Sequence, residues 1–298
     1  MQTKLKVNEG YLKDVRSIYM IGIGGIGMSA LARVLMYAGF SVQGSDARES
    51  RRIKQLIEEG IPVAVDPKRV SFESVDLVIY SSAIHAEHME LEAARASGVR
   101  VCHRAQILAC MLDQAQTSVG ITGTHGKTTT SSMVSYMLSR LGKNPTCVLG
   151  GEAIDFKSNS VLGGEDLWIS EVDESDQTHE LYSLNYVIVT NIEEDHLDHY
   201  GDAEAIKKSF SNFFGNLVNP GVIIYNADDP ELSKIVKESG KPHVSFGLNE
   251  EADFSAQNIA HRDLGISFDV FESGLYAGTV RLEITGEHNV YKVLTTMA

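Results

Sequence analysis

Residues 123–130 read Gly-Thr-His-Gly-Lys-Thr-Thr-Thr, a combination of residue types that suits a bound polyphosphate. The backbone N–H groups of a glycine-rich turn and the positive end of a helix dipole both attract an anion. The ammonium group of Lys127 can reach the outer phosphates of a nucleotide, and the hydroxyl of Thr128 can ligate Mg²⁺. The predicted phosphate-binding residues are Gly123, Thr124, His125, Gly126, Lys127, Thr128 and Thr129.

The segments on either side of this turn support the same interpretation. The apolar run 118–122 predicts a strand, and apolar residues then recur at helical spacing from Met133 to Leu141. The spacing G-x-x-G-K-T is two residues shorter than the usual phosphate-loop motif, so the strand–turn–helix context carries the prediction. A plain glycine-containing turn would not explain a lysine followed by three threonines.

Acidic clusters follow two further predicted strands. The strand at 167–170 leads into Glu-Val-Asp-Glu-Ser-Asp (171–176), and the strand at 186–190 leads into Asn-Ile-Glu-Glu-Asp-His-Leu-Asp-His-Tyr (191–200). Beside a phosphate loop, such strand ends suit Mg²⁺, which prefers oxygen ligands and keeps waters and substrate phosphates in its shell. Most of these acids are expected to be solvated or to cap helices. The predicted site residues are Glu171 and His196.

A second glycine-rich turn, Gly-Ile-Gly-Gly-Ile-Gly (22–27), lies nearer the N-terminus between a predicted strand at 18–23 and a helix at 28–38. A further strand at 40–44 leads to Asp46, about 20 residues beyond the turn, where an acid can bind a ribose hydroxyl. This pattern indicates a dinucleotide-type βαβ unit. It leaves open an NAD-dependent dehydrogenase, or a tight turn in which Asp46 caps a helix.

Two more predicted strands, 76–80 and 99–102, deliver polar residues at their carboxyl ends. The first is followed by Ser-Ser-Ala-Ile (81–84) and the second by His103 and Arg104. Ligands of open α/β sheets bind at this edge. Arg104 can therefore pair with a diphosphate, although an exposed surface arginine is an equal alternative.

The order of these segments predicts an α/β fold with two domains, residues 1–115 and 116–298, which meet at the polar stretch 113–117. The first is expected to be Rossmann-like, and the second to be an α/β domain built on the phosphate loop. A strand at 222–226 continues the second sheet. From Phe254 the pattern becomes alternating, which predicts an antiparallel hairpin with its turn at Ser273-Gly274. A last helix begins near Gly-Glu-His-Asn (286–289).

The composition excludes some classes of function. The 298 residues include 26 basic and 40 acidic side chains, giving a net charge of −14, which argues against nucleic acid as a partner. The apolar run 18–40 contains five glycines and Arg33, so a buried strand–turn–helix is expected rather than a membrane span. Three cysteines without metal-site spacing suggest reduced thiols in the cytoplasm.

Several motifs together resemble the Mur ligase family, in the family's order and over essentially the whole chain. They are G-I-G-G-I-G-M-S-A-L-A (22–32), S-S-A-I (81–84), G-T-H-G-K-T-T-T (123–130), E-V-D-E-S-D (171–176), T-N-I-E-E-D-H-L-D-H-Y (190–200) and G-E-H-N (286–289). The phosphate loop followed by T-N-I-x-x-D-H-x-D is highly specific for the family. The first turn favours its alanine-adding members.

The resemblance implies an ATP-dependent, ADP-forming ligase of peptidoglycan synthesis, and thus a role in cell-wall growth, cell shape and cell division. Its substrates would be UDP-N-acetylmuramate and L-alanine. The carboxylate of the first would take the γ-phosphoryl group of ATP to give an acyl phosphate. The amine of L-alanine would then displace phosphate.

The resemblance also implies roles for single residues. Lys127 would stabilise the transferring phosphoryl group, Thr128 and Glu171 would hold one Mg²⁺, and His196 would hold a second. His288 and Asn289 would face the adenine. The first domain would bind a UDP-sugar, not NAD, through Gly24, Gly25, Ile26, Gly27, Asp46, Ser82, Ala83 and Arg104.

The chain departs from the family pattern at three places. Lys292 stands where members usually have a second asparagine after the one corresponding to Asn289. Ser211 falls where some relatives carry a carbamylated lysine, and neither Lys207 nor Lys208 nearby is assigned that role. The family's third, C-terminal domain would begin where this sequence ends, so a two-domain fragment with little or no ligase activity of its own is expected.

Other functions stay open at this point. A nucleotide-binding module or subunit without ligase activity would carry the same motifs, as would another ligase of the family. An oxidoreductase built on the first turn would need neither the phosphate loop nor the acidic strand ends.

Overall fold

The computed structural model of the chain describes residues 10–193, 202–262 and 264–298. These residues form two compact units, and the predicted α/β class is confirmed. The first unit takes the described residues up to Gln116 together with Asn144–Trp168, and the second takes Thr117–Lys143 and Ile169–Ala298. The predicted boundary after residue 115 differs from this division, because it places 144–168 in the second domain.

The first unit contains a five-stranded sheet in the order β3-β2-β1-β4-β5, with all neighbouring strands parallel. This is the strand order of a Rossmann-like fold. Its elements are η1 (Gly10–Leu12), β1 (Ser17–Ile21), α1 (Ile26–Ala38), β2 (Ser41–Asp46), α2 (Arg51–Glu58), β3 (Val63–Val65), β4 (Leu77–Tyr80), α3 (Met89–Ser97), β5 (Arg100–His103), α4 (Arg104–Leu112), β7 (Thr146–Ala153) and β8 (Ser158–Val161).

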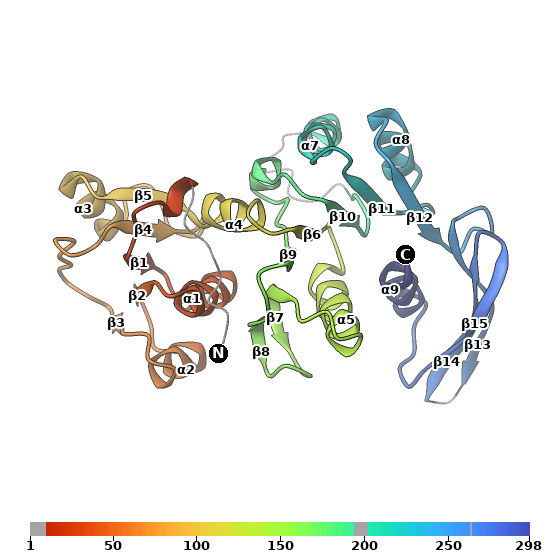
Figure 1. Cartoon of the computed structure of the whole chain (residues 1–298), viewed down its shortest axis with the longest axis horizontal. Coiled ribbons are helices and arrows are strands. Elements are labelled where there is room, and N and C mark those ends of the chain that lie inside the picture. The colour runs from red at the N-terminus through yellow and green to blue at the C-terminus, as the bar shows by residue number, and fades with distance from the viewer. Residues whose placement is uncertain (1–9, 194–201, 263) are drawn as a thin grey trace. The chain divides into compact units, whose positions relative to one another are not determined.

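Helices cover this sheet on both faces, because successive side chains of a strand point in opposite directions. Tyr19 and Ile21 of β1 pack with Leu91 of α3 in one buried cluster. The alternate residues Ile18 and Met20 are also completely buried. Figure 1 shows α1 and α2 together on one side of the strands.

The hairpin of β7 and β8 belongs to the first unit because it packs on α1. Arg33 of α1 is only 7% exposed, and it donates hydrogen bonds of 2.6 Å to Asn159 of β8 and to Glu59. Asn159 in turn donates to the backbone oxygen of Ile26 at 2.6 Å. This buried polar contact joins segments 133 positions apart in the sequence, so linear motif order could not reveal it.

The second unit is built on the strand order β15-β14-β13-β12-β11-β10-β6-β9. Strands β6, β10, β11 and β12 run parallel to their neighbours among them. The elements are β6 (Thr117–Thr122), α5 (Lys127–Arg140), β9 (Leu167–Glu171), η2 (Thr178–Leu181), β10 (Tyr186–Val189), α7 (Ala203–Asn216), β11 (Val222–Asn226), α8 (Pro230–Ser239), β12 (His243–Gly247), β13 (Phe254–Arg262), β14 (Gly265–Glu272), β15 (Leu275–Leu282) and α9 (His288–Met297).

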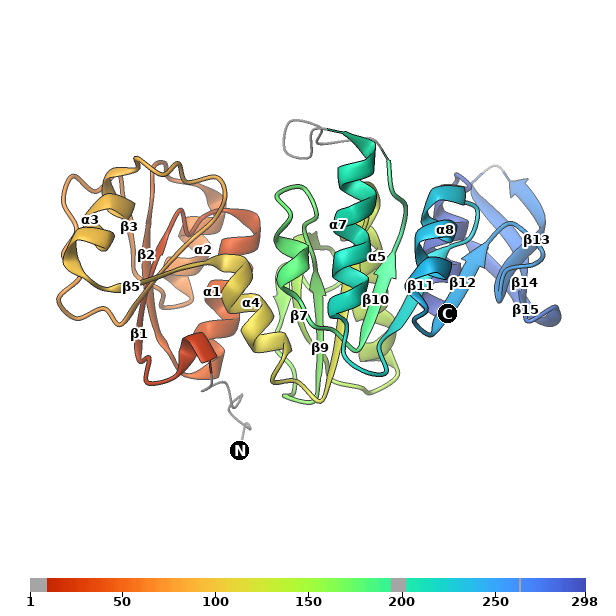
Figure 2. The same cartoon turned by 90° about the horizontal axis from the view of Figure 1, so that it is seen from above.

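Helices α5 and α9 lie together on one face of this sheet, and α7 and α8 lie on the other, as Figures 1 and 2 both show. The carboxyl ends of β6, β10 and β11 therefore meet at one edge, next to the start of α5. None of the helices in the described part of the chain combines the length and the apolar composition that a membrane span requires.

The predicted antiparallel hairpin is present as β14 and β15. Ile266 pairs with Leu282 and Phe268 pairs with Val280, and the side chains of Ile266 and Phe268 are each 1% exposed. The turn at Ser273-Gly274 has φ angles of 49° and 78°. Two consecutive positive φ angles are typical of a tight hairpin turn.

Candidate functional site

The turn between β6 and α5 has the backbone that the sequence predicted for a phosphate loop. Gly123 has a φ of 121°, and Gly126 caps the start of α5 with a φ of 85°, both in a region that favours glycine. A Cβ atom on Gly123 would collide with the Thr190 side chain and lie 2.8 Å from the Asn191 oxygen. A Cβ on Gly126 would meet nothing within 4 Å, so space for an anion lies open at the helix N-terminus.

The residues that follow β10 hold this turn in place. The His125 N–H donates to the Asn191 side-chain oxygen at 2.9 Å, and the Thr124 N–H donates to the Asn191 backbone oxygen at 3.2 Å. The hydroxyl of Thr190 donates to the His125 oxygen at 2.7 Å, and the Glu193 N–H donates to the Thr124 hydroxyl at 2.9 Å. The Thr-Asn that follows the strand is thus a brace for the loop.

Lys127 begins α5 and reaches back over the turn. Its ammonium group donates to the backbone oxygens of Gly123 at 2.7 Å and Thr124 at 3.2 Å, and it forms an ion pair with Glu174 at 2.8 Å. Glu174 is only 4% exposed. Burial raises the pKa of the Glu174 carboxyl group, and the Lys127 ammonium opposes that rise.

The structure brings Thr128 and Glu171 together, since the Thr128 hydroxyl donates to the Glu171 carboxylate at 2.9 Å. A hydroxyl and a carboxylate beside a phosphate cradle suit Mg²⁺, which takes few protein ligands and completes its shell with phosphates and waters. The part of the chain that the structure describes contains no group of three or more His, Cys, Asp or Glu side chains that could hold a metal alone. His196 lies outside the described residues.

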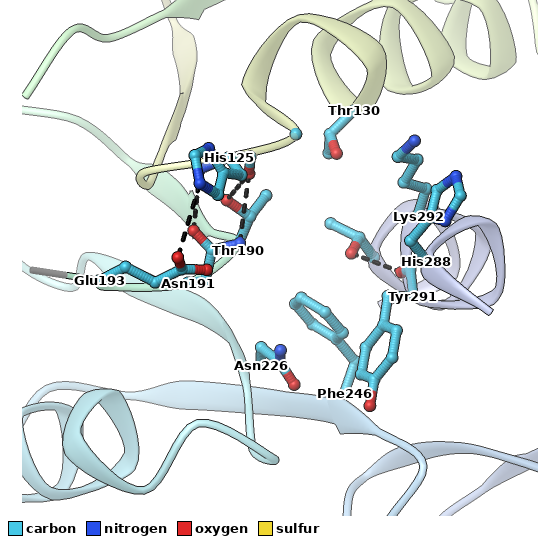
Figure 3. Close-up of a pocket in the computed structure, with 12 residues that line it drawn as sticks. His125, Thr130, Thr190, Asn191, Glu193, Asn226, Phe246, His288, Tyr291 and Lys292 are labelled. Atoms are coloured by element: carbon cyan, nitrogen blue, oxygen red, sulfur yellow. Dashed lines mark hydrogen bonds and ion pairs between the residues drawn. The ribbon is translucent and has the colours of Figure 1, made fainter. Parts of the chain in front are cut away.

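A pocket of about 480 Å³ opens beside the phosphate loop. Figure 3 shows Thr130 and Lys292 toward one side of it, with the rings of Phe246 and Tyr291 toward another. Its lining combines residues of the phosphate loop and of the segment after β10 with residues from β11, β12, α5 and α9, namely His125, Gly126, Thr130, Thr190, Asn191, Glu193, Asn226, Phe246, His288, Tyr291, Lys292 and Thr295.

The two residues predicted to face adenine have different surroundings. His288, the first residue of α9, lines the pocket. Asn289 is 7% exposed, and both ends of its amide are bonded within the protein. Its nitrogen donates to the Thr285 oxygen at 2.8 Å, and its oxygen accepts from the Lys292 ammonium at 3.1 Å.

Two aspartates after β11 position the pocket walls, and neither was among the predicted site residues. Asp228 accepts a hydrogen bond of 2.9 Å from the Tyr291 hydroxyl and others from the backbone of the segment after β12. Asp229 caps α8 through Leu232 and also accepts from the Ile192 N–H at 2.9 Å. The sequence contained a signal for both residues, because they are acids that follow a third predicted parallel strand.

The first unit presents its own set of predicted residues at the carboxyl edge of its sheet. The Asp46 carboxylate accepts from the Gly24 N–H at 2.9 Å, and Arg52 donates to the Gly24 oxygen at 2.8 Å. A Cβ on Gly24 would lie 2.8 Å from that Asp46 oxygen. Ser50, not Asp46, caps the following helix, so the helix-cap alternative for Asp46 is wrong.

The remaining predicted residues of the first unit lie at the same edge. Gly25 is the N-cap of α1, and Ile26 is its first residue. A Cβ on Gly27 would lie 2.9 Å from a guanidinium nitrogen of Arg104, so this cation lies beside the start of α1. Ser82 and Ala83 are exposed after β4, and the Ser82 hydroxyl is 3.0 Å from a ring nitrogen of His103.

The sequence resembles proteins of one family along nearly its whole length. Residues 121–298 match the family described as Mur ligase middle domain, and residues 17–116 match Mur ligase family, catalytic domain. A UDP-N-acetylmuramate–L-alanine ligase from Sorangium cellulosum is 38% identical over 284 residues. That alignment covers 95% of this chain and 60% of the relative, so the chain spans less than two thirds of the relative's length.

Solved structures give the same result. The UDP-N-acetylmuramate–alanine ligase of Thermotoga maritima has a TM-score of 0.83 at 29% identity, covering 94% of this chain and 64% of that chain. The UDP-N-acetylmuramate:L-alanyl-γ-D-glutamyl-meso-diaminopimelate ligase of Neisseria has the same TM-score at 27% identity, covering 95% and 92%.

Proposed function

Because this chain belongs to the Mur ligase family, we propose that it acts in the ATP-dependent joining of L-alanine to UDP-N-acetylmuramate during peptidoglycan synthesis. The observation that carries this proposal is the phosphate loop with Lys127 above it and the Thr128–Glu171 contact of 2.9 Å beside it. Binding alone needs only the glycine-rich turn. The additional lysine, together with a hydroxyl and a carboxylate that can ligate Mg²⁺, suits phosphoryl transfer.

In this proposal, the chemistry occurs at the edge of the second unit's sheet. The carboxylate oxygen of UDP-N-acetylmuramate attacks the γ-phosphorus of ATP, ADP leaves, and an acyl phosphate forms. The amine of L-alanine then attacks the acyl carbon, phosphate leaves with the bonding electron pair, and the amine loses a proton. Lys127 stabilises the negative charge on the transferring phosphoryl group.

The other predicted site residues have supporting roles. Thr128 and Glu171 would hold Mg²⁺, which offsets phosphate charge when bound, and His196 would hold a second ion. The remaining loop residues cradle the phosphates of ATP, and His288 and Asn289 lie toward the adenine. The two oxygen ligands fit a hard cation, and the open space at Gly126 fits a phosphate.

The first unit would hold the sugar nucleotide. Arg104 beside the start of α1 supplies a cation for the diphosphate, and exposed Ser82 and Ala83 lie at the same sheet edge. Asp46 would act through the turn, because its carboxylate fixes the Gly24 N–H. The three cysteines are free thiols, which accords with the cytoplasm as the site of action.

The test is ADP release by the natural protein that carries these residues, with Mg²⁺, ATP, UDP-N-acetylmuramate and L-alanine. We expect turnover only when all substrates are present. Replacing L-alanine with the peptide L-alanyl-γ-D-glutamyl-meso-diaminopimelate distinguishes the activity named for the Neisseria structure. Turnover with the peptide and none with alanine would reassign the substrate, and binding of ATP without any ADP release would support a binding module.

The oxidoreductase alternative has a separate test. A ligand that binds only the folded state raises the melting temperature, by an amount that grows with its concentration relative to Kd. We expect UDP-N-acetylmuramate to stabilise the chain and NADH to leave it unchanged. The reverse pattern would contradict the assignment of the first unit.

A further inference from the structure

We propose that Asp229 is a positioning residue of the phosphate loop, which raises the loop's affinity for the phosphates of a nucleotide by fixing the segment that braces the loop. This inference rests on the proposed function in one respect, namely that the loop at Gly123–Thr130 binds the phosphates of ATP. It goes further because it assigns a role in ligand binding to an aspartate that follows a different strand, β11.

The glycine-rich turn does not fix its own shape. Gly123 and Gly126 have φ angles of 121° and 85°, and glycine adopts such angles and many others at little cost. A turn binds an anion well when its N–H groups already point toward one place before the ligand arrives. The shape of the turn must therefore come from contacts with other parts of the chain.

These contacts come from residues 190–193 after β10, here called the brace segment. The backbone and side-chain oxygens of Asn191 accept from the N–H groups of Thr124 at 3.2 Å and His125 at 2.9 Å. The Thr190 hydroxyl donates to the His125 oxygen at 2.7 Å, and Figure 3 shows Thr190 and Asn191 beside His125. The brace segment itself is neither helix nor strand, so its own position also has to be fixed by a neighbour.

Asp229 holds the brace segment from the start of α8. One of its carboxylate oxygens accepts from the Ile192 N–H at 2.9 Å. The other accepts from the Leu232 N–H at 3.0 Å and so caps α8. Leu232 is completely buried, and Pro230 follows Asp229 at the start of the helix, where its ring restricts the backbone. The carboxylate is therefore fixed by the helix on one side and fixes the backbone of the brace segment on the other.

The helix cap alone does not require an aspartate at this position. Serine, threonine, asparagine and aspartate are all good N-caps, and Asp202 caps α7 in the same manner through the Ala205 N–H at 2.8 Å. What a carboxylate adds is a second acceptor oxygen, because serine and threonine have one oxygen and asparagine has an amino group in place of the other. The contact with Ile192 accounts for this second oxygen.

The sign of the expected effect separates positioning from simple electrostatics. A carboxylate repels a polyphosphate, so its removal alone raises the affinity or, where salt screens the charge, leaves the affinity unchanged. Loss of the contact with Ile192 has the opposite effect, because the N–H groups of the turn then no longer converge before the ligand binds. A variant without the Asp229 carboxylate should thus bind nucleotide more weakly although it carries less negative charge.

The experiment is calorimetric titration of the chain, with Mg²⁺, using the non-hydrolysable β,γ-imido analogue of ATP. The wild type is compared with Asp229→Ser and Asp229→Thr, which keep an oxygen for the cap and lose the one that reaches Ile192. Asp202→Ser is the matched control, since it makes the same change of charge and of cap at α7. The number of sites per chain, from the same titration, reports the fraction of folded protein separately from the dissociation constant.

A double variant tests the route by which Asp229 acts. Asn191→Ala removes the side-chain contact of the brace segment with the His125 N–H. If Asp229 acts through the brace segment, Asp229→Ser and Asn191→Ala damage one shared set of contacts, and their effects on affinity do not add.

We expect Asp229→Ser and Asp229→Thr each to weaken binding of the analogue about tenfold, and Asp202→Ser to leave it within about twofold. Asp229→Ser combined with Asn191→Ala should bind no more than about threefold more weakly than Asn191→Ala alone. Unchanged or tighter binding by both Asp229 variants would overturn the inference. An equal loss in Asp202→Ser, or losses that multiply in full in the double variant, would overturn it as well. Failure of the wild type to bind the analogue would instead refute the proposed function.

Discussion

The two units each place a glycine-rich turn between a parallel strand and a helix, yet different side chains surround the two turns. At Gly22–Gly27 the neighbouring strand end supplies Asp46, which binds the Gly24 N–H, and the nearby cation is Arg104. At Gly123–Gly126 the neighbouring strand ends supply Glu171 and the helix supplies Lys127.

We infer from this difference that the turn determines where an anion can bind, whereas the side chains at the adjacent strand ends determine whether the bound anion reacts. A turn whose N–H is bonded to a carboxylate suits a ligand with hydroxyl and diphosphate groups that remains unchanged. A turn with a lysine and a hydroxyl–carboxylate pair suits a phosphoryl group that is transferred. Changing the side chains around one turn should therefore weaken ligand binding at that turn and leave binding at the other turn unchanged.

The largest expected effect is at Lys127 of the second turn. Lys127→Ala removes the cation that, in the proposed function, faces the outer phosphates, and we expect affinity for a non-hydrolysable ATP analogue to fall by about 100-fold, on the order of 3 kcal/mol. Calorimetric titration measures this loss. Affinity for UDP-N-acetylmuramate, which the first turn would bind, should remain unchanged.

Lys127→Ala also removes the cation that pairs with the buried carboxylate of Glu174, so loss of binding must be separated from loss of folding. Breaking a buried ion pair costs about 3–5 kcal/mol. We expect Lys127→Ala with Glu174→Gln to regain much of the thermal stability but none of the nucleotide affinity. Recovery of affinity in the double variant would show that Lys127 acts only through Glu174.

The second effect concerns acid stability of the second unit, where His179 follows the acidic segment 171–176. His179 is fully buried beside Phe210 and Phe213, and burial lowers its pKa from 6.5 to about 4. Between these values the unfolded chain binds a proton that the folded chain does not. The contribution of neutral, buried His179 to the free energy of unfolding is therefore present above pH 6.5 and is lost as the pH falls toward 4.

The expected loss is about 3 kcal/mol, since each unit of pKa difference corresponds to about 1.4 kcal/mol. His179→Phe keeps a ring in the aromatic cluster and removes the titrating group. Denaturant unfolding at pH 7.5 and pH 4.5, compared between wild type and variant, measures the difference. Equal acid sensitivity of both proteins would assign the effect to other groups.

The third effect is at Arg104 of the first turn. Arg104→Gln removes the cation beside the start of α1, and we expect affinity for UDP-N-acetylmuramate to fall about tenfold. Binding of the ATP analogue should not change. Arg51→Gln is the matched control, since Arg51 is an exposed arginine of the same unit whose side chain is 78% exposed. A tenfold loss in both variants would indicate long-range attraction instead of a contact.

Much of this fold followed from short-range patterns in the sequence. The two strand–turn–helix segments and the Ser273-Gly274 hairpin are local, because glycine, capping and periodicity act within about ten residues. The placement of β7 and β8 was not predictable in this way, since it depends on the buried contact between Arg33 and Asn159, 126 positions apart.

The positions of the candidate site residues were predictable where a motif carries them and not where side chains converge from several strands, and their roles in binding and catalysis stay predictions. Lys127, Thr128 and Glu171 followed from the phosphate loop and the first acid after a strand. Glu174 was one acid among several, and only the structure shows that it is buried and paired with Lys127. That neither Lys207 nor Lys208 acts as a carbamylated lysine stays a prediction. The ammonium group of Lys207 forms ion pairs with Glu204 and Glu231.

The smallest expected effect concerns two buried hydroxyls of α5, the helix that follows the second turn. The hydroxyls of Thr130 and Ser135 have no hydrogen-bond partner among the described residues, and both side chains are completely buried. A buried polar group without a partner costs about 1–3 kcal/mol. Thr130→Val and Ser135→Ala should therefore each raise the free energy of unfolding by about 1 kcal/mol.

Nucleotide binding should separate these two variants, because only Thr130 lines the pocket beside the phosphate loop. If its hydroxyl bonds to bound nucleotide, Thr130→Val gains stability but loses affinity by a few fold, about 1 kcal/mol. Ser135→Ala should gain stability with unchanged affinity. A gain in both properties for Thr130→Val would mean that the pocket prefers an apolar surface there. In that case the loop at Gly123–Gly126 would bind the phosphates, and the part of α5 that contains Thr130 would contribute only packing.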